Sequence, residues 1–174
     1  NSTFAINGRQ RLSRNMDIYI SGEFDTAPEF CGMLKDGQIQ SDSKSEGRNA
    51  CVAFTFPAGT RKVSFRYGIS LISTTQAKLN LHREQQGFNY KEVAKKGREV
   101  WNKALSRIQV KGGTEDQKTV MYTSYYRTME RPVCLSEDGL YFSAFDGKIH
   151  EDGGVPFYTD DWIWDTYRAA HPFY

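Results

Sequence analysis

The sequence predicts an α+β chain in which strands come first and helices follow. Apolar and polar residues alternate up to about residue 73, which is the period of half-buried antiparallel strands. After residue 74 the apolar period changes to 3.6 residues, which is that of amphipathic helices. The first part is therefore expected to be β-structure and the rest helical.

The alternation is clearest in three segments of the first part, residues 16–21, 52–56 and 63–69. Each reads as a half-buried antiparallel strand. The Lys-Asp-Gly sequence at residues 35–37 is a hairpin-turn signal, and the polar run at residues 41–49 is expected to be a loop.

Two long helices are predicted after residue 74. An apolar stripe extends from Val93 to Ile108 and predicts the first. Thr114 is the expected N-cap of the second, Gln117 completes a capping box, and the stripe runs to Met129. The helices should form an antiparallel hairpin whose apolar face needs covering by elements outside this chain, so we expect a fragment.

Composition limits the classes of function. The 174 residues suffice for one domain or pieces of two. A net charge of +2, with both signs interspersed, does not favour nucleic acid as a partner. The 3 cysteines lack CxxC spacing, which suggests neither a zinc site nor a disulfide framework. No apolar run has the length of a membrane span, and the signal peptide of a secreted protein would lie upstream.

Residues 158–172 are the richest segment in aromatic and charged side chains. A helix is expected to begin near Thr159, with Thr159 or Asp160 as its N-cap. Asp165 and Arg168 then share one face of that helix. The plain interpretation of this face is a solvated surface with an Asp165–Arg168 ion pair.

The functional interpretation of the same segment is a sugar pocket. Trp164 offers a flat apolar ring with a polar edge, which suits a pyranose, although aromatic residues also fill β-sandwich cores and helix interfaces. The neighbouring Asp165 carboxylate can accept paired hydrogen bonds from sugar hydroxyls. Both interpretations stay open on spacing alone.

A short hairpin is predicted at residues 139–148, closed by Asp146 and Gly147. Asp146 is expected to bond its own backbone in this turn, or the segment is a site-forming loop between helices. His150 and His171 are expected to be packing or surface residues, and His82 lies on a polar helix face with no special role.

The order of these segments resembles that of the family 92 glycoside hydrolases, which are calcium-dependent exo-acting α-mannosidases. The resemblance covers about Lys62 to the end, and the first sixty residues match weakly. The chain departs from the family pattern at residues 161–163, where the pocket wall is expected to differ, and at residues 129–136, a local variation expected beside the substrate loops. The segments that match in register are residues 61–70, 99–105, 110–115, 121–127, 145–147, 158–160 and 164–172.

The resemblance implies a multi-domain α+β fragment of a two-domain enzyme. Residues 1–73 would be the C-terminal part of an N-terminal β-sandwich, and residues 74–109 would be linker helices. Residues 110–174 would be the first helices of an (α/α)6 catalytic barrel.

The resemblance also implies that the protein removes terminal α-linked mannose from glycans by calcium-assisted, inverting hydrolysis. It would be secreted, periplasmic or on the cell surface. The catalytic acid, the base and the main Ca²⁺ ligands are expected downstream of Tyr174, so no catalytic or metal-binding residue is assigned here. Substrate contact is implied for Trp164 and Asp165, and less directly for Arg168 and Asp146.

Two other functions remain open. One is a non-catalytic carbohydrate-binding or structural module, in which case the gene beyond this chain would end in a linker. The other is an exo-glycosidase or phosphorylase of the same architecture that acts on another sugar without calcium.

Overall fold

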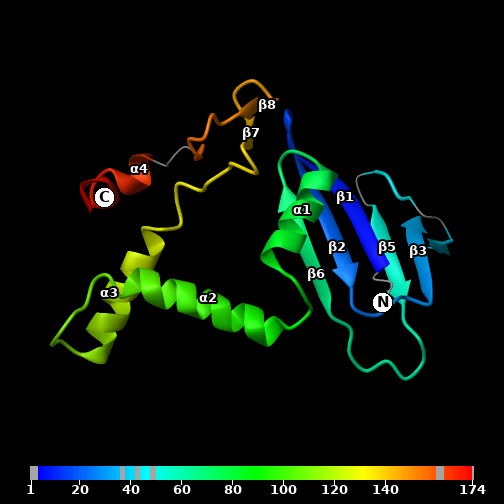
Figure 1. The fold of residues 1–174 in the computed structure, drawn as a ribbon, viewed down its shortest axis with the longest axis horizontal. Helices are drawn as coiled ribbons and strands as arrows, with labels where there is room; N and C mark the ends of the chain where they lie inside the picture. The colour runs from blue at the N-terminus through cyan, green and yellow to red at the C-terminus, as the bar shows by residue number, and fades with distance from the viewer. Residues whose placement is uncertain (1–3, 36–37, 42–43, 48–49, 160–162, 174) are drawn as a thin grey trace. The chain divides into compact units, whose positions relative to one another are not determined.

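The computed structural model consists of two compact units (Figure 1). The first comprises Asn1–Gln10 and Asp17–Phe88, and the second comprises Arg11–Met16 and Asn89–Tyr174. None of the described helices is both long and apolar enough to cross a membrane. The structure describes residues 4–35, 38–41, 44–47, 50–159 and 163–173.

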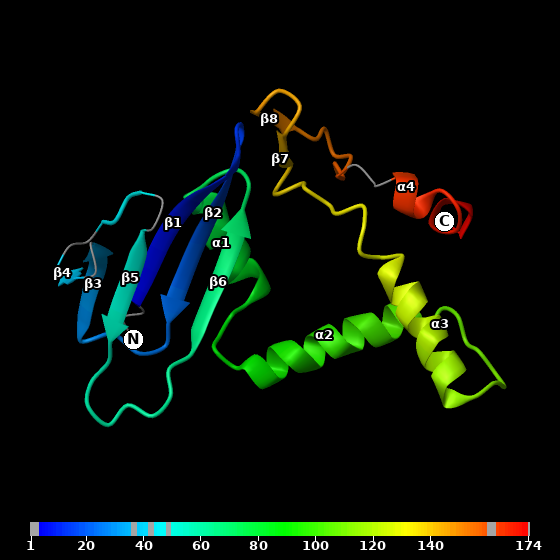
Figure 2. The same ribbon diagram turned by 180° about the vertical axis from the view of Figure 1, so that it is seen from behind.

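The first sheet has three strands, seen side by side from behind in Figure 2. Its order is β1 (Phe4–Ser13), β2 (Met16–Phe24) and β6 (Phe65–Ser70). β2 and β6 are antiparallel, with Phe24 opposite Phe65. The strands predicted at residues 16–21 and 63–69 are thus confirmed, with later ends in both cases.

The second sheet also has three strands, in the order β4 (Gln38–Gln40), β3 (Phe30–Lys35) and β5 (Cys51–Thr55). β3 is antiparallel to both neighbours. β5 confirms the strand predicted at residues 52–56. Part of the predicted turn, residues 36–37, lies outside the described residues, as do 42–43 and 48–49 of the predicted loop.

Phenylalanine rings join the two sheets. The Phe24 ring centroid lies 4.7 Å from that of Phe65, 5.0 Å from that of Phe54 and 5.5 Å from that of Phe56. Phe4 reaches the same cluster at 5.8 Å from Phe54. Rings from both sheets therefore meet edge to face, as expected in the core of the predicted β-sandwich, and much of the aromatic content of this unit is packing.

Helix α1 (Thr74–Glu84) packs on the other face of β6. Ser73 caps its N-terminus by accepting a hydrogen bond from the backbone amide three residues on. Ala77 and Leu81 are at most 1% exposed and lie directly over Gly68. A Cβ atom on Gly68 would lie 2.4 Å from the Ala77 carbonyl oxygen, so the helix rests on bare strand backbone.

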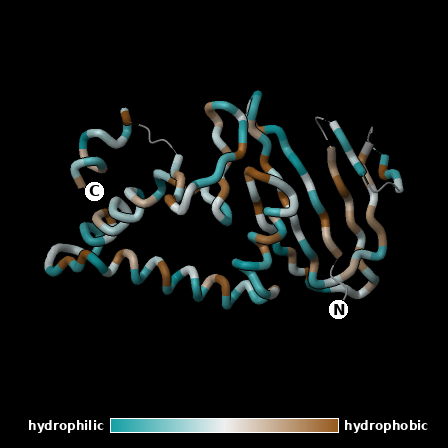
Figure 3. The backbone as a smooth tube through the Cα atoms, turned by 45° about the horizontal axis from the view of Figure 1, so that its top comes forward, coloured by the Kyte–Doolittle hydropathy of each residue, from teal (hydrophilic) through white to brown (hydrophobic). Residues whose placement is uncertain are grey.

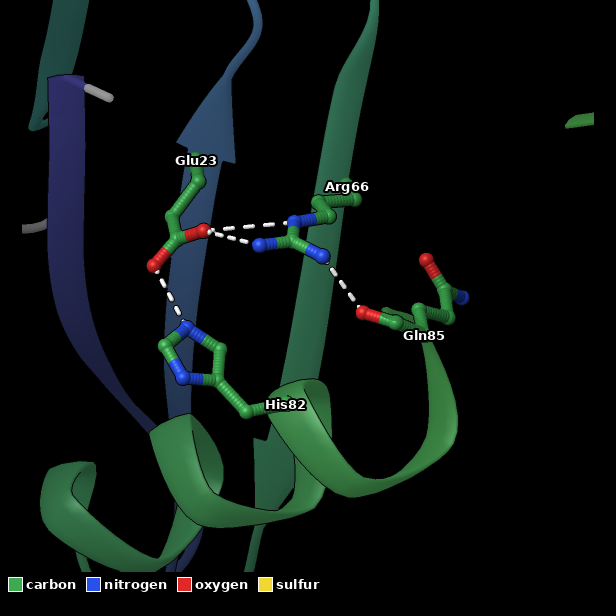
Figure 4. A network of polar contacts seen from close by, with 4 residues as sticks. All are labelled: Glu23, Arg66, His82 and Gln85. Carbon is green, nitrogen blue, oxygen red and sulfur yellow. Dashed lines mark hydrogen bonds and ion pairs between the residues drawn. The ribbon is translucent and has the colours of Figure 1, made fainter. Parts of the chain in front are cut away.

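A polar network links the same helix to the sheet (Figure 4). Arg66 Nη2 lies 2.6 Å and its Nε 3.2 Å from Glu23 Oε2, and another Arg66 nitrogen donates to the Gln85 carbonyl. His82 Nε2 lies 2.7 Å from Glu23 Oε1. The guanidinium also lies over the Phe88 ring, 4.7 Å from its centroid. His82, expected to have no special role, thus has a buried partner.

The second unit begins with helices α2 (Tyr90–Leu105) and α3 (Glu115–Arg127). Hydropathy alternates along α2, as an amphipathic helix requires (Figure 3). Trp101 and Tyr126 pack with ring centroids 4.5 Å apart, and Tyr122 Oη donates to the Ile108 carbonyl at 3.0 Å. The C-terminal part of α2 thus contacts the C-terminal part of α3, so the two helices meet near these ends and not along the length of the predicted hairpin.

The predicted capping box at the start of α3 is confirmed. The backbone amide of Gln117 donates to Thr114 Oγ1 at 3.2 Å, and the backbone amide of Thr114 donates to Gln117 Oε1 at 2.9 Å. Two orphan amides are satisfied reciprocally, which explains why α3 begins here.

The last segment differs from the helix predicted from Thr159. Thr159 is not an N-cap: its amide donates to the Val133 carbonyl at 2.8 Å, and its Oγ1 accepts from the Val133 amide at 2.8 Å. Short helices follow instead, α4 (Ile163–Thr166) and α5 (Ala170–Phe173). Strand-like pairing with an earlier loop has overridden the helical spacing, while Asp160 lies outside the described residues. The domain boundaries after residues 73 and 109 stay predictions.

Candidate functional site

The hairpin of β7 (Leu140–Ser143) and β8 (Lys148–Glu151) carries the first predicted contact residue, Asp146. Asp146 Oδ1 accepts a hydrogen bond from the Lys148 amide at 3.1 Å. Gly147 follows with a φ of +68°, the left-handed region that favours glycine. The predicted turn, with Asp146 bonding its own backbone, is therefore confirmed.

The carboxylate of Asp146 has a second partner, His150. Nε2 of His150 lies 2.9 Å from Asp146 Oδ2. Burial raises the pKa of Asp146, but hydrogen bonds from Lys148, His150 and Ser143 outweigh it and hold the pKa below its usual value. The group is thus an anion at neutral pH, and its side chain is 43% exposed. The three donors leave about one lone-pair position of the carboxylate that a hydroxyl group could use.

Three rings stack behind this pair. The Tyr141 and Phe157 ring centroids lie 4.0 Å apart at an interplanar angle of 13°. The His150 ring stacks on Tyr141 with centroids 5.5 Å apart and an angle of 27°. Tyr141 and His150 are directly opposite in the hairpin register, which brings them together. The sequence interpretation missed this stack, although the alternation of the two strands could have revealed it.

Helix α4 carries the other predicted residues. Trp164 is 90% exposed, and Asp165 is exposed beside it. The Trp164 ring is not buried against any of the described residues, so its face is open to a ligand. Both side chains are thus accessible in this structure, and their substrate contact stays a prediction.

Arg168 does not form the ion pair expected in the plain interpretation. Its Nε donates to Tyr167 Oη at 2.7 Å, and its guanidinium lies 5.3 Å from the Tyr167 ring centroid. Asp165 and Arg168 form no ion pair among the described residues. The Asp165 carboxylate is thus not engaged by this arginine.

The predicted residues lie in two groups. Within the part of the chain that the structure describes, no hydrogen bond or ring contact joins Asp146 to residues 163–168. The hairpin places Asp146 and His150 together, while Trp164, Asp165 and Arg168 are neighbours only along the chain. Their shared role in one pocket stays a prediction.

No group of three or more His, Cys, Asp or Glu side chains that could hold a metal ion occurs among the described residues. Among the described residues, hollows in both units are lined by other side chains than those of the predicted contact residues. A hollow of about 690 Å³ in the first unit is lined by Phe4, Cys31, Met33 and Val52 among others, which is the inner face of the sheets.

Comparison with known protein families identifies one catalytic domain. A model described as the glycosyl hydrolase family 92 catalytic domain matches residues 76–174. This range begins within α1 and includes every predicted contact residue. A search of curated proteins finds no match for the chain.

Solved structures give a similar result. An inverting GH92 mannosidase from Bacteroides thetaiotaomicron is 29% identical and has a TM-score of 0.78, with 97% of this chain and 24% of that chain covered. A GH92 α-mannosidase from the same species is 25% identical with a TM-score of 0.73, covering 91% of this chain and 22% of that one.

That second enzyme is also known in complex with mannoimidazole, a structure that matches at 24% identity with a TM-score of 0.73, over 91% of this chain and 22% of that one. The chain thus spans about a quarter of the length of the solved structures that it matches. The α+β interpretation, with a β-sandwich portion before the barrel helices, agrees with these neighbours.

Proposed function

Because this chain belongs to glycosyl hydrolase family 92, we propose that it is part of an exo-acting enzyme that removes terminal α-linked mannose from glycans. The observation that carries the proposal is the match to two mannosidases over 97% and 91% of the chain. Both relatives are described as mannosidases, which supports mannose over another sugar. The resemblance also supports a secreted, periplasmic or cell-surface location.

In this proposal Trp164 and Asp165 contact the terminal sugar. The exposed ring of Trp164 packs on the apolar face of the pyranose. The Asp165 carboxylate accepts hydrogen bonds from neighbouring hydroxyls, which fixes the rotation of the sugar about that platform. Arg168, held by Tyr167, is close enough along the chain to donate to a further sugar oxygen.

Hydrolysis with inversion needs two carboxyl groups about 6.5–9.5 Å apart, one to protonate the leaving oxygen and one to activate water. We assign neither role to a residue of this chain. The described residues also do not provide a set of ligands that fits Ca²⁺, so the proposed calcium dependence concerns the complete protein and no ligand is named here.

The first test is the activity of the protein encoded by the complete gene. We expect it to release mannose from an aryl α-mannoside, and proton NMR of the first product should show the β-anomer, because an inverting mechanism reverses the anomeric configuration. Chelation with EGTA should abolish release and added calcium should restore it. Release of a different sugar, or no release in calcium, contradicts the proposal.

The second test concerns Asp165. Replacing it by asparagine, Asp165→Asn, should lower kcat/KM for the α-mannoside about ten- to hundredfold, because hydrogen bonds to a charged group contribute about 1.5–3 kcal/mol. The change keeps the size of an exposed side chain, so the melting temperature should stay the same. Asp116→Asn, at an exposed acidic residue in the first turn of α3, is the matched control and should leave kcat/KM unchanged.

A further inference from the structure

We propose that His150 is a positioning residue that fixes the Asp146 carboxylate in the orientation in which it meets the sugar. This inference rests on the proposed function, since it assumes that Asp146 contacts substrate. Its basis is a chain of contacts in one hairpin: Phe157 stacks on Tyr141, Tyr141 stacks on His150, and His150 pairs with Asp146.

The contacts constrain each member in turn. Tyr141 stacks on Phe157 at a centroid distance of 4.0 Å and on His150 at 5.5 Å. An imidazole that stacks on a fixed ring has little freedom to rotate, so its Nε2 keeps one direction. That nitrogen lies 2.9 Å from Asp146 Oδ2, while the Lys148 amide holds Oδ1 at 3.1 Å. These two donors, together with the Ser143 side chain, therefore set the plane of the carboxylate.

A fixed carboxylate can still bind a ligand. An ionised carboxylate offers about four lone-pair positions, of which the Lys148, His150 and Ser143 donors use three. The Asp146 side chain is 43% exposed and that of His150 is 39% exposed, so the carboxylate is still accessible to a ligand. A carboxylate that is already held in its binding orientation loses less conformational entropy when the ligand binds. Loss of the His150 contact should therefore weaken the affinity for the ligand.

Two variants of His150 separate the hydrogen bond from the ring. His150→Phe keeps a ring that can stack on Tyr141 but has no donor for Asp146. His150→Gln loses the ring, but its amide nitrogen can reach about as far as Nε2 and can donate to Asp146. A purely structural role predicts that the Phe variant behaves like the wild type and that the Gln variant loses stability.

We expect the opposite result in the protein encoded by the complete gene, assayed with an aryl α-mannoside. His150→Phe should raise KM about three- to tenfold with kcat within about twofold and an unchanged melting temperature, and His150→Gln should restore KM to within about twofold of the wild type. Glu151→Gln is the matched control, because Glu151 is the exposed neighbour of His150 in β8 and its side chain takes no part in holding Asp146.

The outcomes distinguish the two proposals. Asp146→Ala should raise KM at least as much as His150→Phe. If Asp165→Asn impairs the enzyme but Asp146→Ala or His150→Phe leaves KM unchanged, the role of His150 is overturned and the proposed function stands. If the wild type hydrolyses no α-mannoside, both are overturned.

Discussion

The variant Glu23→Ala is expected to destabilise the first unit by about 3–5 kcal/mol, the cost of removing one partner from a buried ion pair. The Glu23 side chain is 5% exposed and that of Arg66 is 13% exposed. Without the carboxylate, the largely buried guanidinium keeps its charge but loses its anionic partner, and His82 loses its partner at 2.7 Å. The loss should therefore exceed that of an ordinary hydrogen bond.

The destabilisation should depend on pH. Burial raises the pKa of Glu23, but hydrogen bonds from His82 and Arg66 and the charge of Arg66 outweigh it and hold the pKa below its ordinary value of 4.5. A carboxyl group whose pKa is lower in the folded state stabilises that state above its unfolded pKa. The difference in stability between wild type and Glu23→Gln should thus be full above about pH 4.5 and shrink as pH falls below it.

Hydrogen exchange measured by mass spectrometry is the appropriate readout, because the protein has more than one unit and a single melting temperature mixes them. Amides of β6 and α1 should exchange about a hundredfold to a few thousandfold faster in Glu23→Ala. The matched control is Glu46→Ala. Glu46 Oε1 also forms an ion pair, 2.7 Å from Lys44 Nζ, but both side chains of this pair are at least 74% exposed. Equal effects of the two variants would show that burial of the pair is irrelevant.

Gly68→Ala is expected to destabilise the same unit by about 3 kcal/mol, at the upper end for overpacking by one methyl group. The new Cβ would lie 2.4 Å from the Ala77 carbonyl oxygen and 2.8 Å from Leu81 Cβ. Backbone atoms of a helix cannot rotate away as a side-chain tip can. Helix α1 must therefore move off β6 as a body, and it loses part of the burial of Leu81.

The control for Gly68→Ala is Gly8→Ala in β1, a strand of the same sheet. A Cβ on Gly8 has no atom within 4 Å, so this variant should leave the stability unchanged or raise it slightly, because glycine weakens a strand. Circular dichroism and exchange of the α1 amides would measure both. Normal protection of α1 in Gly68→Ala would contradict the close packing of helix on strand.

Regular periodicity was the part of the fold that the sequence could predict. The strands β2, β5 and β6 alternate cleanly, and the capping box of α3 is a local signal that needs no tertiary information. β1 was not predicted because its second half carries polar residues where apolar ones would mark a strand, and it forms by pairing with β2.

The predictions that failed depended on contacts between distant residues. Thr159 follows a helix-like pattern, yet its backbone pairs with Val133, 26 residues earlier. His82 meets Glu23 across 59 residues. Neither contact can be predicted from the spacing of apolar and polar residues within one segment of the sequence. The substrate-contact roles predicted for Trp164 and Asp165 rest on family resemblance and stay predictions, and in the structure both side chains are exposed.

The network at the end of α1 also constrains how this unit can change in evolution. Arg66 binds Glu23, the Gln85 carbonyl and the Phe88 ring at once, through two strands and the segment after the helix. A mutation that neutralises Glu23 alone leaves a buried cation, whereas neutralising both members of the pair can be nearly harmless. Residues 23 and 66 are therefore expected to covary among relatives. A relative that lacks the charge at one of these positions should also lack it at the other and carry apolar residues at both.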